Sequence, residues 1–419
     1  MADRTSPAPP PADEPHSVLR NPTVVGTALA SLFSDSGHEM ATAALPGFLT
    51  SLGAPAAALG LIEGIADAAL SASKMAGGVL ADRPGVERKK VMAAGYLTSG
   101  AAYASIGLAG AWPFAAISRA VAWIARGLRT PARESVLAAS VPATHYGRAF
   151  GLERAGDSVG AIIGPLAAAA LIGVLGYRWL LAASFLPAVG AALCALLLVR
   201  EAPRLRALGT PGFRHILGFA AARGPYRRLL AASALYGLGN FSATLLILRA
   251  ADLLTAAGRS TVSASTAAVL LYAGHNAANA LAAYPAGRLA DRIGRRPVLA
   301  LGIGLYAAAC LAFARGSATV WVLALLFVAV GTSTAMVETA RSGYASELLP
   351  DHLRGRGFGL LGLVDGIGDL VSSVVVGVLW TVVNPAWGFT YATVLSAAGV
   401  LPLLARRGGQ TADDHLVLP

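Results

Sequence analysis

Charged residues are scarce in this sequence. They make up 13% of its 419 residues, whereas a soluble globular domain carries about 25%. Hydrophobic residues reach 55%, which argues against a water-soluble enzyme. Charged and Pro/Gly-rich joints divide the chain into twelve apolar segments of 17 to 26 residues, and a membrane-crossing helix needs about 20. We therefore predict an all-α polytopic membrane protein with twelve transmembrane helices.

Cysteines and the common catalytic motifs are also nearly absent. Cys194 and Cys310 lie in apolar segments without C-x-x-C spacing, so neither a disulfide framework nor a metal knuckle is indicated. The sequence has no G-x-x-x-x-G-K-[ST] motif, which argues against ATP as the energy source. After His38 and Glu39, Thr42 stands where an H-E-x-x-H zinc site needs its second histidine. We expect no cofactor, no resident metal and no enzymatic activity.

Basic residues are concentrated in the loops on one side of the predicted spans. The net charge is +11, and 26 arginines and lysines lie on that side against 4 on the other. Such an excess marks the cytoplasmic side. We expect both termini there, in a multi-pass protein of the inner membrane. Nucleic acid is not an expected partner, because these residues form no single basic face. A membrane-embedded sensor would need a larger soluble domain than the longest cytoplasmic segment, 201–228.

Two motifs recur at nearly the same spacing. The first occurs twice, 209 residues apart: Gly78, Asp82, Arg83 and Gly85, then Gly287, Asp291, Arg292 and Gly294. The second, at 147–152, recurs 208 residues later at 355–360. We interpret the chain as a duplicated six-helix unit with both copies in the same orientation. The predicted parts are a disordered cytoplasmic tail (1–22), a first bundle (23–200), a basic cytoplasmic linker (201–228), a second bundle (229–405) and a cytoplasmic tail (406–419).

The first motif resembles the cytoplasmic loop signature of the major facilitator superfamily, a family of secondary transporters. The resemblance covers residues 24–405 and implies two bundles that rock around a central site. It also implies that Asp82 braces the start of helix 11 near Arg356. Asp291 would brace the start of helix 5 near Arg148 in the same way, and together these contacts would close the cytoplasmic face. The alternative is a basic turn that only fixes topology.

Helix 5 resembles the family's antiporter signature. The resemblance rests on Gly151, Gly160, Gly164 and Pro165, with 168–169 as alanines where the signature continues with two glycines. Residues 35–49 and 126–133 resemble a bacterial branch of drug and small-molecule exporters. The resemblance therefore implies export. The alternative is that these small residues only let two helices pack closely.

Ionisable residues inside the predicted spans form the candidate site. A charge at the bilayer centre costs at least about 2.5 kcal/mol, so such side chains should face the bundle interior. Spans 3, 6, 9 and 12 have none, which places them at the periphery. Nine embedded acids against three or four bases predict an acidic cavity that suits protons and cationic or neutral substrates. The candidate proton-coupling and cavity residues are Asp35, His38, Glu39, Glu63, Asp67, Arg119, Asp157, His275, Asn276, Asn279, Asp365 and Asp369.

Structural ion pairs are the alternative for these residues. Glu63 or Asp67 would pair with Arg119. Glu338 would pair with Arg341 at the cytoplasmic end of helix 10. In the second half, neutral histidine and asparagine side chains replace the acids of the first. This difference favours proton handling in the first half and shared substrate contacts, with a purely structural polar network as the alternative.

We predict a proton-coupled antiporter that exports a small amphipathic or cationic compound by alternating access and works as a monomer. Uptake is the alternative direction. A divalent metal ion is the alternative substrate, because Asp35, His38 and Glu39 share one helix face and offer oxygen and nitrogen ligands.

Overall fold

The computed structural model describes residues 17–83, 85–142, 145–201, 224–349 and 351–404, and within these ranges every regular element is a helix. The first half contains α1 (Ser17–Arg20), α2 (Pro22–Ser51), α3 (Ala56–Asp82), α4 (Arg88–Ile106), α5 (Trp112–Ala139), α6 (Tyr146–Ala183) and α7 (Phe185–Leu197). The second half contains α9 (Pro225–Gly239), α10 (Ala243–Ala256), α11 (Thr261–Ile293), α12 (Arg295–Arg315), α13 (Val320–Leu348), α14 (Asp351–Val382) and α15 (Pro385–Leu404).

These helices make twelve crossings, as predicted. The long element α6 is broken at Gly176, whose φ of 67° lies in the left-handed region. The chain reverses there, so the part before Gly176 is the fifth crossing, and the part after it continues into α7 as the sixth. The elements α9 and α10 together form the seventh. Seven helical stretches are long and apolar enough to span a membrane by composition, and one of them, 148–197, contains both the fifth and the sixth crossing.

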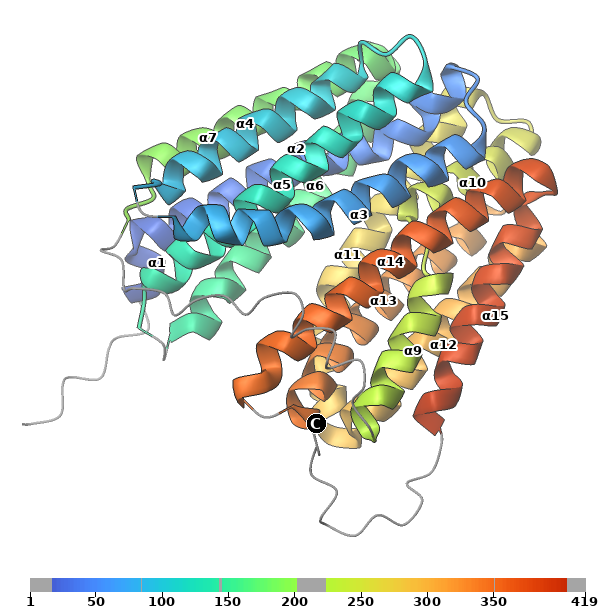
Figure 1. The fold of residues 1–419 in the computed structure, drawn as a ribbon. Coiled ribbons are helices and arrows are strands. Elements are labelled where there is room, and N and C mark those ends of the chain that lie inside the picture. Colours follow the sequence, from blue (N-terminus) through green and yellow to red (C-terminus); the bar gives the residue numbers. More distant parts are fainter. Residues whose placement is uncertain (1–16, 84, 143–144, 202–223, 350, 405–419) are drawn as a thin grey trace, which may run out of the picture.

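The helices form two bundles, α1–α7 and α9–α15 (Figure 1). Contacts between the bundles involve chiefly α3 with α14 and α6 with α11. The first pair touches where Gly60 faces Gly377, at the end of the molecule remote from the basic loops. Toward the basic end, which the charge asymmetry predicts to be cytoplasmic, the two bundles diverge (Figure 1). The helices of spans 3, 6, 9 and 12 pack within their own half, as their lack of charge predicts.

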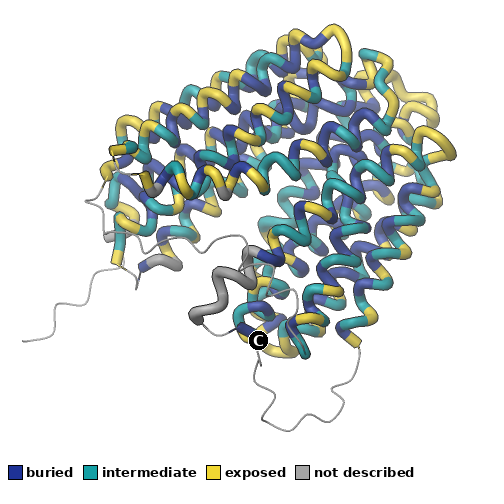
Figure 2. The backbone as a smooth tube through the Cα atoms, in the orientation of Figure 1, coloured by how far each residue is buried: buried dark blue, intermediate teal, exposed yellow. Residues whose placement is uncertain are grey.

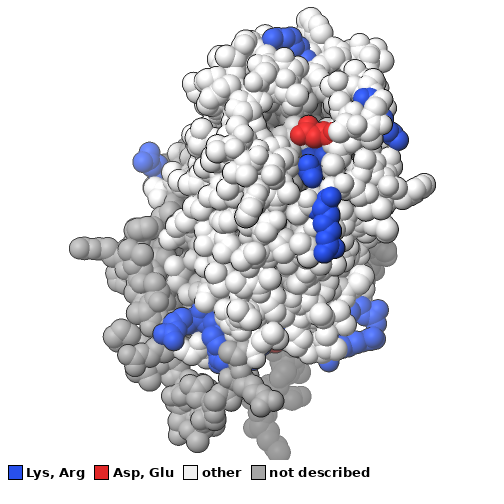
Figure 3. All heavy atoms as spheres, turned by 90° about the vertical axis from the view of Figure 1, so that its right-hand side faces the viewer, with Lys and Arg blue, Asp and Glu red and all other residues white. Residues whose placement is uncertain are grey.

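The outer surface is apolar, as a lipid-facing surface must be. Burial follows the inner faces of the helices, while exposed residues lie along their outer faces (Figure 2). Large apolar side chains such as Trp179, Leu186 and Trp321 are exposed. Figure 3 shows that the face of the second half carries few charged side chains between its two ends. Lipid covers such a surface in place of water.

Several element boundaries differ from the predicted ones. Helix α1 begins at Ser17, inside the predicted tail, and α9 begins at Pro225, inside the predicted linker. The rest of the tail, residues 202–223 of the linker and residues 405–419 lie outside the described residues. Helix α5 continues to Ala139, and in its last part Arg133 pairs with Glu153 of α6.

Glycines permit the close approach of α6 to α2. A Cβ atom on Gly160 would lie 2.4 Å from the Leu32 carbonyl oxygen, and one on Gly164 would lie 2.5 Å from that of Ser36. Only hydrogen fits at such distances, so these positions require glycine. Gly151 has open space around it. The closely packed pair that the sequence left as an alternative is present, and the meaning of the motif for transport direction stays a prediction.

Candidate functional site

A row of arginines on α5 faces the interior of the first bundle. Three of them, Arg119, Arg126 and Arg133, are seven residues apart and therefore share one helix face. Arg126 donates two hydrogen bonds to the Asp35 carboxylate, at 2.8 and 3.3 Å. Arg133 lies 2.7 Å from Glu153. Asp35 of α2 and Glu153 of α6 are thus each paired with an arginine from one face of α5.

Arg119 and Glu63 form a fully buried ion pair at 3.0 Å. The side chains are 1% and 3% exposed. The guanidinium also donates to Thr42 at 3.1 Å and lies over the rings of Tyr103 and Trp123. The Glu63–Arg119 pair that the sequence left as an alternative is therefore present, and the role of Glu63 in transport stays a prediction. Such a pair holds α3 to α5, because either partner alone would be an uncompensated buried charge.

Asp35 also meets a second acid. Asp157 of α6 lies beside Asp35. Two neighbouring carboxylates repel each other, and a proton on one of them relieves this repulsion. The Asp35–Asp157 pair beside Arg126 is therefore a candidate place for a proton in the first half.

The three ionisable groups of α2 point to different partners. Asp35 binds Arg126, while His38 packs between the rings of Tyr103 and Trp123, at 5.3 and 5.2 Å. Glu39 accepts a hydrogen bond from the hydroxyl group of Tyr272 on α11, at 2.7 Å, across the interface between the halves. Among the described residues, no group of three or more His, Cys, Asp and Glu side chains is arranged to hold a metal ion.

A central cavity of about 200 Å³ lies between the two halves. It contains one half-buried acid from each half, Asp67 of α3 and Asp369 of α14. Neither acid has a basic side chain within ion-pair distance among the described residues. The described lining residues are Asp67, Asn240, Phe241, Ser242, Ala243, Leu246, His275, Tyr306, Val330, Thr334 and Asp369, with no lysine or arginine among them.

The break between α9 and α10 lies at this cavity. Asn240 has non-helical backbone angles, and its carbonyl oxygen accepts a hydrogen bond from Ser372 at 2.7 Å. The Ser242 amide donates to the Ser373 hydroxyl group at 3.0 Å, and the Ser242 hydroxyl donates to Glu63 at 3.2 Å. Irregular backbone at membrane depth is tolerated where protein groups satisfy it, and it commonly marks a binding site. Apart from the polar residues themselves, no local pattern in the sequence indicates this break.

The polar residues of α11 divide into two groups. His275 lines the central cavity and is 7% exposed, and its Nδ1 atom has no hydrogen-bond partner. Its ring stacks on that of Tyr272 at 5.7 Å. Asn276 instead donates to the Ala161 carbonyl oxygen of α6 at 2.7 Å, which joins the two halves. Asn279 is half-buried and lines neither the central cavity nor the outer pocket described below.

One expected contact near the basic end differs from the structure, because Arg341 binds Asp365 at 2.6 Å and not Glu338. Asp291 faces Arg295 of its own half at 4.0 Å. Its predicted contact with Arg148 belongs to a closed cytoplasmic face, and it stays a prediction because the bundles diverge at this end. The side chains of Asp82 and Arg356 lie outside the described residues.

The last glycine of each repeated loop has the same conformation. Gly85 and Gly294 have φ values of 82° and 96°, in the left-handed region that favours glycine. The duplicated sequence therefore folds into duplicated turns. Gly78 and Gly287 lie earlier, within α3 and α11, and Arg83 and Arg292 are exposed.

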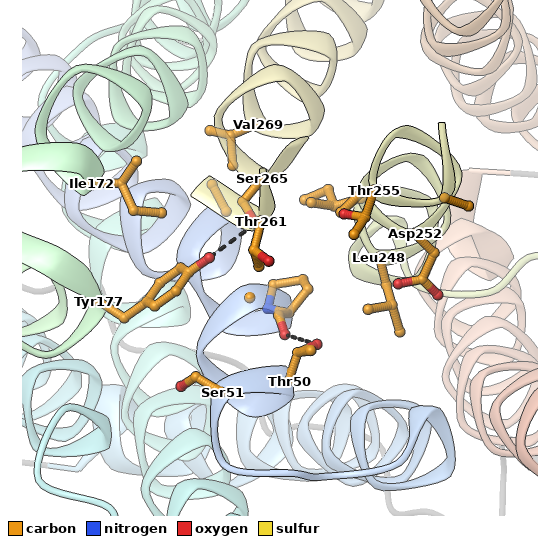
Figure 4. A pocket seen from close by; sticks show the side chains of 16 residues that line it. Thr50, Ser51, Ile172, Tyr177, Leu248, Asp252, Thr255, Thr261, Ser265 and Val269 are labelled. Atoms are coloured by element: carbon orange, nitrogen blue, oxygen red, sulfur yellow. Dashed lines mark hydrogen bonds between the residues drawn. The ribbon is translucent and has the colours of Figure 1, made fainter. Parts of the chain in front are cut away.

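A second, larger pocket of about 550 Å³ lies near the end remote from the basic loops (Figure 4). Side chains of α2, α6, α10 and α11 surround it, and Tyr177 donates to Ser265 across it, from one half to the other, at 3.0 Å. Asp252 of α10 is its sole charged residue among the described lining. Sequence reasoning omitted Asp252 because it lies at the end of its span, where a charge is ordinary. The described lining residues are Ala43, Pro46, Gly47, Thr50, Ser51, Ile172, Tyr177, Ile247, Leu248, Ala251, Asp252, Thr255, Ala256, Thr261, Ser265 and Val269.

Comparisons with known proteins match nearly the whole chain. The family model described as the Major Facilitator Superfamily matches residues 27–254 and 229–414. An uncharacterised MFS-type transporter of Methanocaldococcus jannaschii is 30% identical over 380 residues, which cover 89% of this chain and 92% of that protein. An uncharacterised protein of Mycobacterium tuberculosis is 27% identical over 369 residues, covering 87% of this chain and 88% of that protein.

Solved transporter structures share the fold. The nucleoside transporter NupG superposes with a TM-score of 0.72 at 14% identity, covering 92% of this chain and 100% of that one. A bacterial homologue of the human lysosomal transporter Spinster, inward-facing and occupied, gives 0.71 at 16%, covering 94% and 95%. A D-xylose–proton symporter gives 0.70 at 16%, covering 93% and 98%. At these identities the likeness concerns the fold alone.

Proposed function

This chain belongs to the major facilitator superfamily of membrane transporters, and we propose that it is a proton-coupled antiporter that exports a small amphipathic or cationic compound. The superfamily membership makes it a multi-pass membrane protein that carries a small molecule. Export, proton coupling, the inner membrane and action as a monomer are our proposals.

The charge of the central cavity carries this proposal. Asp67 and Asp369 enter the cavity from opposite halves without a basic partner, whereas Asp35, Glu63 and Asp365 are each bound by an arginine. Two unpaired acids in a partly desolvated space attract a cation more strongly than they would in water. They also come from different halves, so a bound cation would contact both halves at once. This is the arrangement that alternating access requires.

Proton coupling is assigned to the Asp35–Asp157 pair in the first half. A proton shared by the two acids would leave one negative charge, which Arg126 neutralises. Loss of that proton would leave two carboxylates beside one guanidinium. The resulting repulsion between α2 and α6 would favour a rearrangement of these two closely packed helices. The proton and the substrate would then bind at different sites, and both would change the conformation of the first bundle.

Proton release from everted membrane vesicles with an acidified interior tests this function. We expect a cation such as tetraphenylphosphonium to dissipate the pH gradient in vesicles that contain the protein. Asp35→Asn should abolish this response while leaving the amount of folded protein unchanged. Glu87→Gln, an exposed acid in a basic loop, is the matched control and should respond as the natural protein does.

Two results would overturn the proposal. A normal response of Asp35→Asn would remove this residue from proton coupling. Alkalinisation of the external medium when the compound is added would mean that compound and proton enter the vesicle together. That result would establish uptake by symport in place of export. Separate response curves for cations, neutral compounds, anions and divalent metal ions would identify the substrate class.

A further inference from the structure

We infer that the outer pocket is a second binding site for an amphipathic cation, placed directly beyond the central cavity on the same exit route. This inference rests on the proposed function for the direction of travel. The binding site itself does not require proton coupling. The position of the pocket, the chemistry of its lining and the contact that separates it from the central cavity all favour such a site.

The two cavities follow one another along the same two helices. On α10, Ala243 and Leu246 line the central cavity, and one face of the next stretch outward lines the outer pocket, with Ile247, Leu248, Ala251, Asp252, Thr255 and Ala256. On α11, His275 lines the central cavity and Val269 the outer pocket, which is six residues, or about 9 Å, further out. A molecule that leaves the central cavity away from the basic end therefore meets the outer pocket next.

The lining of the outer pocket fits a molecule with an apolar body and a positive charge. Buried Ile247, Leu248 and Val269 form an apolar interior, while Thr255 and Asp252 are exposed at the mouth. In Figure 4 the side chains of Asp252, Thr255 and Tyr177 are arranged around one common space. No described lining residue carries a positive charge. Arg249, one turn before Asp252 on α10, interacts with it from outside the lining, where its guanidinium donates to the Phe313 carbonyl oxygen and lies over the Phe389 ring. The volume of about 550 Å³ falls within the range of about 300 to 1,000 Å³ that is typical of small-molecule sites.

The hydrogen bond between Tyr272 and Glu39 lies between the two cavities. Tyr272 is placed on α11 between Val269 and His275, and Glu39 lies one turn inward of Ala43, a lining residue of the outer pocket on α2. The bond joins the two halves at 2.7 Å. It therefore partitions the route in this conformation, and separation of the halves would remove it. The outer pocket would then receive a cation when the outer ends of the bundles separate.

Protection of an introduced cysteine tests the inference without transport. Thr255→Cys places a thiol at the mouth of the outer pocket, and its rate of reaction with a membrane-impermeant maleimide is measured on the purified full-length protein. Tetraphenylphosphonium at ten times its Kd should slow the reaction about tenfold, because it leaves about one site in eleven free. Tetraphenylborate has the same shape and a negative charge, so it should not slow the reaction.

Four variants make the result specific. Asp252→Asn should abolish protection of Thr255→Cys, and Glu87→Gln should leave it intact. Val383→Cys, an exposed position at the outer end of α14, measures any general effect of the cation on the reagent. Thr334→Cys, which lines the central cavity, reports binding there separately.

The outcomes separate this inference from the proposed function. Protection of Thr334→Cys without protection of Thr255→Cys overturns the second site and leaves the exporter standing. Protection of Thr255→Cys that persists in Asp252→Asn, or that tetraphenylborate produces equally, overturns the assignment to a cation. Protection at neither position overturns the second site and the cationic substrate together. Protection at both positions in a protein that shows no export supports the second site and overturns the exporter.

Discussion

Glu39 of α2 accepts a hydrogen bond from Tyr272 of α11, and this contact joins the two halves of the transporter at 2.7 Å. Glu39 is also 3.7 Å from His38. The bond is formed while the bundles touch at one end and diverge at the other. It therefore belongs to the conformation that is open toward the basic loops, and its strength contributes to the balance between conformations.

Tyr272→Phe should shift this balance. The variant keeps the aromatic ring that stacks on His275 and loses only the hydroxyl group. A hydrogen bond contributes about 1 kcal/mol net, which corresponds to about a fivefold change in the ratio of two conformations. Spin labels attached at Thr50→Cys and Thr255→Cys lie at the outer ends of opposite halves. The distance between them, measured by pulsed electron spin resonance, should gain a longer component. An unchanged distance distribution would contradict a role of this bond in the conformational balance.

Arg119→Met should strongly destabilise the protein. It leaves the Glu63 carboxylate buried without its partner, which costs about 3 to 5 kcal/mol in comparable buried pairs. The unfolding midpoint of the purified protein should fall, and the double variant with Glu63→Gln should recover part of the loss. A double variant as unstable as the sum of the single ones would show that the two residues act independently.

Gly160→Ala should weaken the packing of α6 on α2. The added methyl group would lie 2.4 Å from the Leu32 carbonyl oxygen, so the backbones must separate. Overpacking of this kind costs about 1 to 3 kcal/mol. Gly151→Ala is the matched control in the same helix, because open space surrounds that position. Thermal unfolding of the two variants should therefore differ, with Gly151→Ala at least as stable as the natural protein.

Asp67→Asn and Asp369→Asn should each weaken the binding of tetraphenylphosphonium in the central cavity. Each removes one of the two unpaired charges, and a tenfold increase in Kd corresponds to 1.4 kcal/mol. Asp365→Asn is the control, because Asp365 lies one turn from Asp369, is bound by Arg341 and lies outside the described cavity lining. Equal effects of all three variants, measured by protection of Thr334→Cys, would contradict a specific role of the cavity acids.

The sequence predicted the membrane crossings and several of their contacts. The twelve helices and the peripheral position of four of them follow from the scarcity and placement of charge. The Arg119–Glu63 pair was one of two alternatives, because the cost of burying a charge demands a partner but does not select between Glu63 and Asp67. The structure selected Glu63, which left Asp67 free to enter the cavity.

Other features had no local signal. Arg341 lies three residues after Glu338, and the expected pair assumed that neighbours on one helix bind each other, but Asp365 of α14 lies closer to its guanidinium. The interruption at Asn240 is satisfied by Ser372 and Ser373, more than 100 residues away. Asp252 becomes part of a pocket only when α10 packs beside α2, α6 and α11.

The sequence by itself determined that the chain crosses a membrane twelve times in two repeats, and it predicted an acidic interior. These properties depend on the free energy of moving each residue out of water. That free energy adds up along the chain whichever residues later become neighbours. Only the tertiary structure decided which acids are paired with arginine and which face the cavities between the two halves. Those assignments depend on distances of a few ångströms between side chains from different helices, and such distances arise only when the bundles pack together.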